Sequence, residues 1–164
     1  MELLYSIILP LGTMDNQKCI ADVIVEEMRK ADRIDIAVGY VSKSSLIELD
    51  ELIVNSSIKN VSLVIGMYYV EGMPENSYHT AMRINEKWSN AGIGEIRIVK
   101  SFKYHGKAYC FYKNGEPFSA IVGSANLGVM KLEASNRRQY ELAALTESVQ
   151  EVNEIATHIQ QLKG

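Results

Sequence analysis

Four polar residues of types that act on phosphate esters occur in two short segments, Tyr104-His105-Gly106-Lys107 and Gly123-Ser124-Ala125-Asn126. A neutral histidine can attack phosphorus and form a covalent phosphohistidine, which splits one difficult displacement into two easier steps. Lysine supplies a positive charge, and serine and asparagine supply neutral donors, for the negative charge of a phosphoryl transition state. The two segments therefore predict phosphodiester chemistry, and the candidate catalytic residues are His105, Lys107, Ser124 and Asn126.

Two apolar runs place these segments next to each other. Residues 108–112 follow the lysine, residues 118–122 precede the second segment, and a turn-rich stretch containing Asn114-Gly115 joins them. Asn-Gly between two β-prone runs predicts a hairpin. Residues two apart in a strand point to the same face, so each motif would project two polar side chains together. We therefore expect the four side chains to converge on one place.

A structural explanation of the same residues is also available. His105 would be an ordinary half-buried histidine, and residues 123–126 would be a strand-to-helix turn with Asn126 near the helix N-cap. This explanation suffices for a His-x-Lys tripeptide alone, because such tripeptides recur by accident. It accounts poorly for the complete set at this spacing, so we favour the catalytic interpretation.

The elements that must position these residues follow from the apolar patterns along the chain. Strand patterns alternate with helix patterns, which predicts an α/β sandwich with a mixed sheet. The length of 164 residues and the 47% hydrophobic content suit one compact domain over residues 1–164. Trp88 has helical spacing from Ile84 and is expected in the core. The predicted strands are residues 1–10, 34–38, 61–67, 95–99, the two hairpin runs and 140–145, and the predicted helices are residues 16–31, 44–54, 77–90 and 148–162.

The cysteines and the amino terminus indicate a cytoplasmic protein. Cys19 and Cys110 lie far apart inside predicted elements and form no C-x-x-C pattern, which favours free buried thiols. The apolar start of the chain lacks a basic leader and carries Glu2, so we interpret it as a strand rather than a signal peptide. No run is long enough to predict a membrane span.

Basic residues are concentrated around the motifs. The whole chain has 17 basic and 20 acidic residues, but residues 95–141 contain 8 basic and 4 acidic ones. Such a segment can attract phosphate. Any single one of its cations is equally well explained as a solvated residue at a strand edge. The candidates for a phosphate-attracting field are Lys100, Lys103, Lys107, Lys113, Lys131, Arg137 and Arg138.

Other hydrolytic mechanisms lack their sequence patterns. The chain has no Walker loop, no H-E-x-x-H and no Cys/His cluster with zinc spacing. It also lacks the Asp-x-Lys or Glu-x-Lys pattern of the common metal-dependent restriction nucleases. We therefore predict a mechanism with no metal ion and no cofactor.

The stretch from His105 to Asn126 resembles the signature of the phospholipase D superfamily, which is His-x-Lys, four residues, Asp, and then Gly-Ser or Gly-Gly followed by Asn. Tyr112 stands where the superfamily has its aspartate, which weakens the link to lipid-cleaving members. The chain is most similar to the catalytic domains of NgoFVII- and BfiI-type restriction endonucleases. Residues 34–42 also resemble the second strand and active-site rim of that group, so the resemblance covers roughly residues 30–150. It implies a three-layer α/β/α sandwich with a mixed sheet.

The resemblance also implies further site residues. In these relatives a downstream glutamate bonds the histidine, and Glu141 in a strand-like setting is our choice for that role. Glu133, in a stretch expected to be a loop or short helix, is the competitor. The family pattern would place Tyr40, Ser42 and Tyr104 around the substrate, and Lys103 joins them from the basic segment.

A single His-x-Lys motif implies a homodimer, because the family reaction uses two histidines. A two-fold axis through the site would bring two copies of His105 to one phosphate. The other histidines, His79 and His158, have no supporting motif and are expected at the surface.

The expected function is that of a metal-independent phosphodiesterase that cuts DNA, as the catalytic domain of a type II restriction endonuclease. A separate DNA-recognition domain is compatible with this function. Two alternatives remain open. One is a phospholipid-directed member of the superfamily, and the other is a non-catalytic dimerisation or nucleic-acid-binding module.

Overall fold

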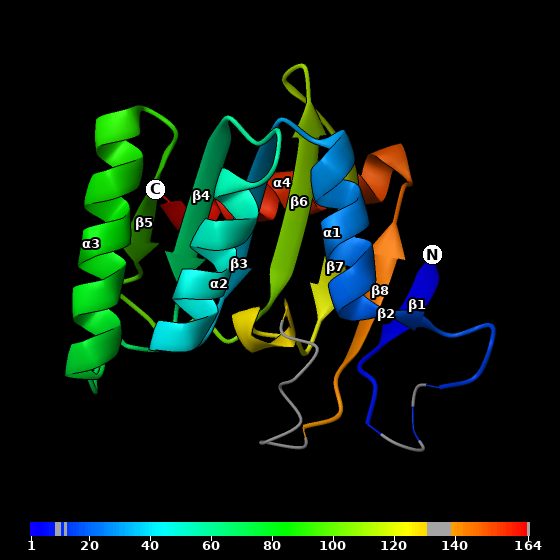
Figure 1. Ribbon diagram of the computed structural model, residues 1–164, viewed down its shortest axis with the longest axis horizontal. Coiled ribbons are helices and arrows are strands. Elements are labelled where there is room, and N and C mark those ends of the chain that lie inside the picture. The colour runs from blue at the N-terminus through cyan, green and yellow to red at the C-terminus, as the bar shows by residue number, and fades with distance from the viewer. Residues whose placement is uncertain (9–10, 12, 131–138, 164) are drawn as a thin grey trace.

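A computed structural model describes residues 1–8, 11, 13–130 and 139–163. It contains eight strands and four α-helices within these residues (Figure 1). The strands are β1 (Glu2–Tyr5), β2 (Lys18–Cys19), β3 (Arg33–Val38), β4 (Asn60–Ile65), β5 (Gly94–Ile98), β6 (Ala108–Lys113), β7 (Glu116–Gly123) and β8 (Leu142–Thr146). The helices are α1 (Ile20–Lys30), α2 (Lys43–Val54), α3 (Glu75–Ala91), α4 (Val149–Lys163) and the short 3₁₀ helix η1 (Leu127–Met130).

All eight strands form one mixed sheet in the order β2-β1-β8-β7-β6-β3-β4-β5. The strands β3, β4 and β5 are parallel, whereas β6 and β8 run antiparallel to their neighbours. The carboxyl ends of β3, β4 and β7 therefore lie at the same edge as the amino ends of β6 and β8. This edge is at the bottom of the view in Figure 1, and we call it the motif edge.

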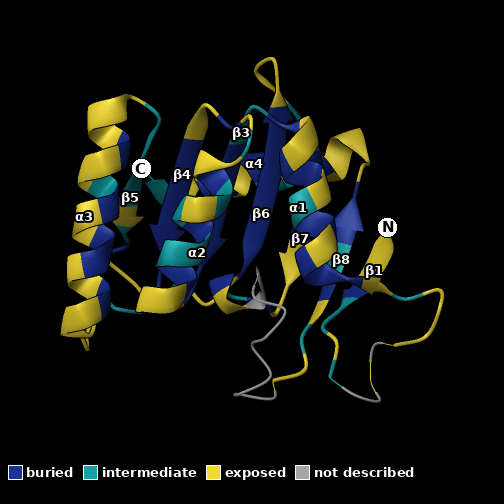
Figure 2. Ribbon diagram, in the orientation of Figure 1, coloured by how far each residue is buried: buried dark blue, intermediate teal, exposed yellow. Residues whose placement is uncertain are grey.

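Helices cover both faces of the sheet. The helices α1, α2 and α3 lie in front of the sheet in Figure 1, and α4 lies behind it. Strand residues alternate between two apolar clusters: Tyr109 and Phe111 join the cluster of the front face, while Ala108 and Cys110 join the cluster beneath α4. Figure 2 shows the central strands β3, β4 and β6 as a buried layer beneath helices whose outer faces are exposed. The predicted three-layer α/β/α sandwich with a mixed sheet is confirmed.

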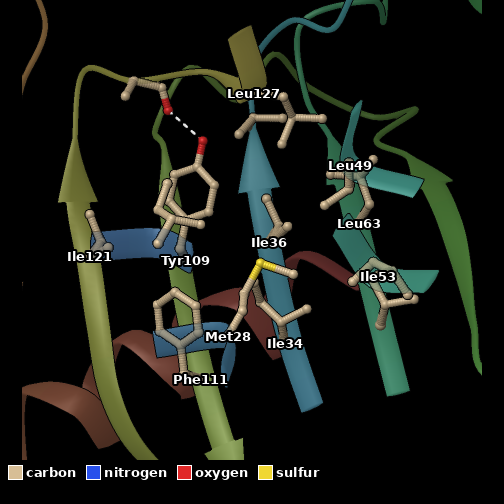
Figure 3. Close-up of a cluster of buried hydrophobic side chains, with 14 of the residues drawn as sticks. Met28, Ile34, Ile36, Leu49, Ile53, Leu63, Tyr109, Phe111, Ile121 and Leu127 are labelled. Atoms are coloured by element: carbon tan, nitrogen blue, oxygen red, sulfur yellow. Dashed lines mark hydrogen bonds between the residues drawn. The ribbon is translucent and has the colours of Figure 1, made fainter. Parts of the chain in front are cut away.

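The central strands are fixed by large side chains on the front face (Figure 3). Tyr109, Phe111 and Ile36 are each no more than 1% exposed, and they pack between the sheet and the front helices. Burying an aliphatic or aromatic side chain of this size contributes about 1.5–3 kcal/mol. These strands therefore form a firm base for the loops that leave them at the motif edge.

The predicted hairpin is present. Its turn contains Asn114 and Gly115, whose φ angles are 52° and 82°. These are the left-handed values that a two-residue turn requires at both central positions. The hairpin turn points away from the motif edge, at the top of the view in Figure 1.

Most predicted elements agree with the structure to within a few residues, and Trp88 is fully buried as expected. Cys19 and Cys110 are free, buried thiols. One expectation about the motifs was wrong. The four candidate catalytic side chains do not project from strands. His105 and Lys107 precede β6, which begins at Ala108, and Ser124 and Asn126 follow β7, which ends at Gly123. No helix in the described part of the chain is long and apolar enough to cross a membrane.

Candidate active site

Four loops meet at the motif edge, and each brings one element of the predicted site. His105 and Lys107 precede β6, Ser124 and Asn126 follow β7, and Glu141 directly precedes β8. The fourth loop follows β3 and contains Gly39 and Tyr40. The backbone N–H of Gly123 donates to the carbonyl of Lys107 at 3.2 Å, which joins the two motif segments directly.

His105 is exposed and faces the loop that follows β3. A Cβ atom on Gly39 would lie 3.5 Å from His105 Cδ2, and the rings of His105 and Tyr40 meet edge to face with centroids 6.3 Å apart. Among the residues that the structure describes, no group forms a hydrogen bond with the His105 ring. The imidazole is thus open to an incoming group.

Lys107 is buried, with only 8% of the residue exposed. Its Nζ donates to the carbonyl oxygen of His105 at 2.6 Å. Burial lowers the pKa of the Lys107 ammonium, while the negative charge of Glu141 acts in the opposite direction. An ammonium group has three donor protons, and among the described residues one of them is taken by the His105 carbonyl, so two can serve an anion next to His105.

Ser124 connects the second motif to the residue before β8. Its hydroxyl donates to the carboxylate of Glu141, and it accepts a bond from the N–H of Leu142 at 3.1 Å. The backbone of Glu141 is held from the other side, because its N–H donates to the Ser6 hydroxyl at 2.7 Å. Glu141 therefore lies in the site, but its carboxylate bonds Ser124 and not the His105 ring. The competitor Glu133 lies outside the described residues.

Asn126 is oriented by the loop that follows β3. Its Oδ1 accepts bonds from the backbone N–H groups of Gly39 at 3.1 Å and of Tyr40 at 3.2 Å. Because the oxygen is occupied, the amide N–H₂ group is the end that remains for a ligand. This orientation suits the predicted role of Asn126 as a donor to negative charge.

A buried tyrosine supports the second motif from below. Tyr109 is 1% exposed, and its hydroxyl donates to the carbonyl of Ala125 at 2.8 Å, as the dashed line in Figure 3 shows. Burial raises the pKa of Tyr109 above its ordinary value, with a smaller contribution from the charge of Glu141. The phenol stays neutral at physiological pH, and its contact is structural.

The predicted substrate-binding residues differ in how their side chains are paired. Tyr40 is 38% exposed next to His105. The Ser42 hydroxyl is occupied in capping α2, where it accepts from the N–H of Ser45 at 3.1 Å. Lys103 is exposed and pairs with Glu71 at 3.3 Å. Tyr104 directs its hydroxyl toward His158 of α4, at 2.9 Å from Nε2.

The predicted phosphate-attracting field is smaller than expected in the described residues. Lys113 ends β6 next to the hairpin turn, so it lies at the opposite end of that strand from Lys107. This part of the expectation was wrong, because the strand separates two lysines that are close in sequence. Lys131, Arg137 and Arg138 lie outside the described residues.

Sequence reasoning missed three contributors to the site. Tyr68 supports Tyr40 with a ring contact at 5.5 Å, and its hydroxyl bonds both the N–H and the carbonyl of Val41. Ser6 holds Glu141 although 135 residues separate them in sequence. His158 is exposed, as expected, but it is bonded to the residue before His105. None of these long-range contacts has a local sequence pattern.

One solved structure shares this fold with a TM-score above 0.5. Phosphatidylserine synthase of Haemophilus influenzae Rd KW20 matches with a TM-score of 0.58 and 15% identity over 98% of this chain and 37% of that one. Yeast tyrosyl-DNA phosphodiesterase matches with a TM-score of 0.42 and 17% identity over 88% of this chain and 32% of that one. That score is too low to carry an argument. The chain thus spans little more than a third of the length of the first of these proteins.

The sequence profile of the NgoFVII restriction endonuclease N-terminal PLD domain matches residues 17–164. The chain belongs to this family. The comparison with curated protein sequences finds no match.

Proposed function

We propose that this protein is a metal-independent phosphodiesterase that cuts DNA through a phosphohistidine on His105. The observation that carries the proposal is an exposed imidazole without a hydrogen-bond partner among the described residues, next to a buried lysine and an oriented asparagine amide. Membership of a restriction endonuclease family supports DNA as the substrate.

The reaction has two displacement steps. In the first, a ring nitrogen of His105 forms a bond to phosphorus while the bond from phosphorus to the leaving oxygen breaks, and that oxygen takes a proton from a general acid. In the second, water attacks phosphorus, loses a proton to the same group, and releases His105. The free donors of Lys107 and Asn126 stabilise the charge on the phosphoryl oxygens in both steps.

The general acid in this proposal is His105 of a second copy of the chain. His79 pairs with Glu75 on α3 at 3.5 Å, and His158 bonds Tyr104, so both are engaged elsewhere. An isologous dimer with its two-fold axis at the motif edge would supply the second imidazole to the same phosphate. The carboxylate assigned to bond the imidazole is Glu141, which bonds Ser124 in this structure, with Glu133 as the second candidate.

In this proposal residues 1–164 are the catalytic domain. Reading a DNA sequence requires contacts with base edges over a wider surface than one phosphate site provides. We therefore assign recognition of the target site to a further domain of the enzyme and place the reaction in the cytoplasm.

The test is cleavage of supercoiled plasmid and of labelled single strands by the purified protein in excess EDTA. The proposal predicts cutting that resists the chelator and is lost in His105→Ala. The matched control is His79→Ala, which removes another exposed histidine and should cut like the unchanged protein. Cutting that needs a divalent metal, or that survives in His105→Ala, would contradict the proposal. Hydrolysis of phospholipid vesicles without DNA cutting would favour the lipid-directed alternative, and no hydrolysis of either would favour a binding module.

A further inference from the structure

The residue that precedes His105 is inserted into the fold rather than turned toward the site. The N–H of Tyr104 donates to the carbonyl of Gly66 at 2.9 Å, where β4 has just ended. A Cβ atom on Gly66 would lie 2.5 Å from Tyr104 Cβ, and one on Gly106 would lie 2.5 Å from the Tyr104 hydroxyl oxygen. Both glycines are therefore needed to admit the tyrosine ring, which packs with the apolar cluster beneath α4.

The inserted ring reaches α4 on the opposite face of the sheet from Tyr109. Its hydroxyl lies 2.9 Å from Nε2 of His158, and the two ring centroids are 5.4 Å apart. The contact spans 54 residues of sequence, and it is the point where α4 meets the segment that carries His105. Burial raises the pKa of Tyr104, so the phenol is protonated and can donate to a neutral imidazole.

We propose that Tyr104 and His158 form a positioning pair that fixes the direction of the His105 ring, and this inference rests on the function proposed above. The pair acts through the backbone, because His105 is flanked by the anchored Tyr104 and by Gly106, which has little torsional restraint of its own. Neither Tyr104 nor His158 touches the phosphate in this assignment. Tyr104 is thus a positioning residue and not the substrate-binding residue that the sequence suggested.

The expected cost of losing the pair follows from the precision that attack on phosphorus requires. A displacement of about 1 Å in a reacting group can cost about 100-fold in rate. The pair is one hydrogen bond at a partly exposed position, so its loss should loosen His105 without unfolding the domain. We therefore expect an effect on kcat and little effect on KM.

The kinetic test uses variants that change the contact and little else. Tyr104→Phe keeps the wedged ring and removes the hydroxyl, His158→Ala removes the acceptor, and His158→Gln keeps an amide near the position of Nε2. We expect kcat to fall about tenfold in the first two variants, with KM within about twofold. The double variant should be no slower than either single one, because the residues act as a unit. His158→Gln should restore most of the loss. The proposal would be overturned if kcat were unchanged in both single variants, or if the double variant lost as much kcat as the two single losses combined.

A second readout is independent of cleavage. The chain has 3 histidines, so their ring signals in an NMR spectrum can be assigned by replacing them one at a time. Tyr104→Phe and His158→Ala should both shift or broaden the His105 signals, whereas His79→Ala should leave them unchanged. His105 signals that stay constant in the first two variants would refute the positioning role. If the unchanged protein cuts no phosphodiester, the proposed function fails, and the His105 signals still decide whether the pair positions this ring.

Discussion

At the motif edge the His105 ring is exposed and has no hydrogen-bond partner among the described residues, whereas on the α4 face near the start of β3 a buried carboxylate is paired with several neighbours. The carboxylate of Asp35 is 1% exposed. It accepts bonds from Arg33 at 2.8 and 3.1 Å and from Gln160 at 3.0 Å, and Lys163 lies 3.4 Å away. We call these four residues the Asp35 cluster.

The Asp35 cluster also affects its uncharged neighbours. Burial raises the pKa of Cys110 to about 12, with a further contribution from the charge of Asp35. Burial and the same charge raise the pKa of Tyr112, whose ring lies 4.0 Å from the guanidinium carbon of Arg33. Both groups remain protonated at neutral pH, so neither the thiol nor the phenol is prepared for chemistry.

A hollow of about 570 Å³ lies beside the Asp35 cluster, lined by Arg33, Asp35, Lys163 and Ser62 among others. Its size does not make it the candidate site, because the Arg33 and Lys163 cations on its wall are both paired with the buried Asp35 carboxylate. The motif edge differs in that Lys107 and Asn126 bond to backbone groups and, among the described residues, keep further donors without a partner. The two regions differ in how their polar groups are paired, and our proposal places the reaction at the motif edge.

The sharpest way to separate the two regions is to remove one residue from each. Asp35→Ala should lower the free energy of unfolding by about 3 kcal/mol, because it leaves Arg33 and Lys163 without their buried partner. Cleavage per folded molecule should stay unchanged. His105→Ala should abolish cleavage and alter unfolding by less than about 0.5 kcal/mol. Urea unfolding curves of both variants measure stability, and plasmid assays measure cleavage. An Asp35→Ala protein that is stable but inactive would contradict the distinction between the two regions.

The next largest effect is expected at Lys107, which combines features of both regions because it is buried but keeps free donors. Lys107→Met should lower kcat by about 10²- to 10³-fold, as expected for the loss of a donor to transition-state charge. Lys107→Arg keeps the charge and should recover part of this loss. Single-turnover rates on a labelled oligonucleotide measure it, and a rate within threefold of the unchanged protein in Lys107→Met would refute the assignment.

The pH dependence offers a third comparison. Only the protonated form of Lys107 can donate to the phosphate, and its pKa lies below the ordinary 10.5 because the side chain is buried. As pH rises, the Lys107 ammonium loses its proton at a lower pH than a solvated lysine does. The midpoint of the alkaline limb of the kcat profile should therefore lie below pH 10.5. Lys107→Arg should remove this limb. An alkaline limb that is identical in both proteins would assign it to another group.

The smallest effect concerns the hairpin turn, which lies far from the motif edge. Gly115→Ala forces a side chain into a left-handed conformation with φ near 82° and should cost about 1 kcal/mol of stability. Cleavage should not change. The matched control is Asn114→Gly, which fits the same turn, and the melting temperatures of the two variants give the measurement.

Local patterns predicted most of the strands and helices, and the three-layer arrangement was implied by the family resemblance. The alternation of Ile34, Ile36 and Val38 indicates β3, and Asn114-Gly115 indicates the hairpin, because both signals depend on neighbouring residues. The extent of the strands near the motifs was not predictable, because it depends on pairing between strands: β6 begins at Ala108, opposite Ala37 and Val122. Sequence spacing cannot show this.

The site was predictable where its residues are close in sequence, and not where they meet only in space. His105, Lys107, Ser124 and Asn126 follow one signature, and the structure brings them to one edge. The bonds of Asn126 to Gly39 and Tyr40 join positions 86 and 87 residues apart, and no local pattern reports such a contact. The same holds for the contacts of Asp35 with Gln160 and Lys163, which lie 125 and 128 residues further along the chain.

The most direct test of the account is to capture the covalent intermediate. The protein would be mixed with a labelled DNA substrate in excess EDTA, quenched in alkali within the first turnover, and digested for mass spectrometry. The account predicts a nucleotide joined through phosphorus to the peptide that contains His105, labile to acid and absent from His105→Ala. Rapid cleavage with no adduct on this peptide, or an adduct on another residue, would contradict it.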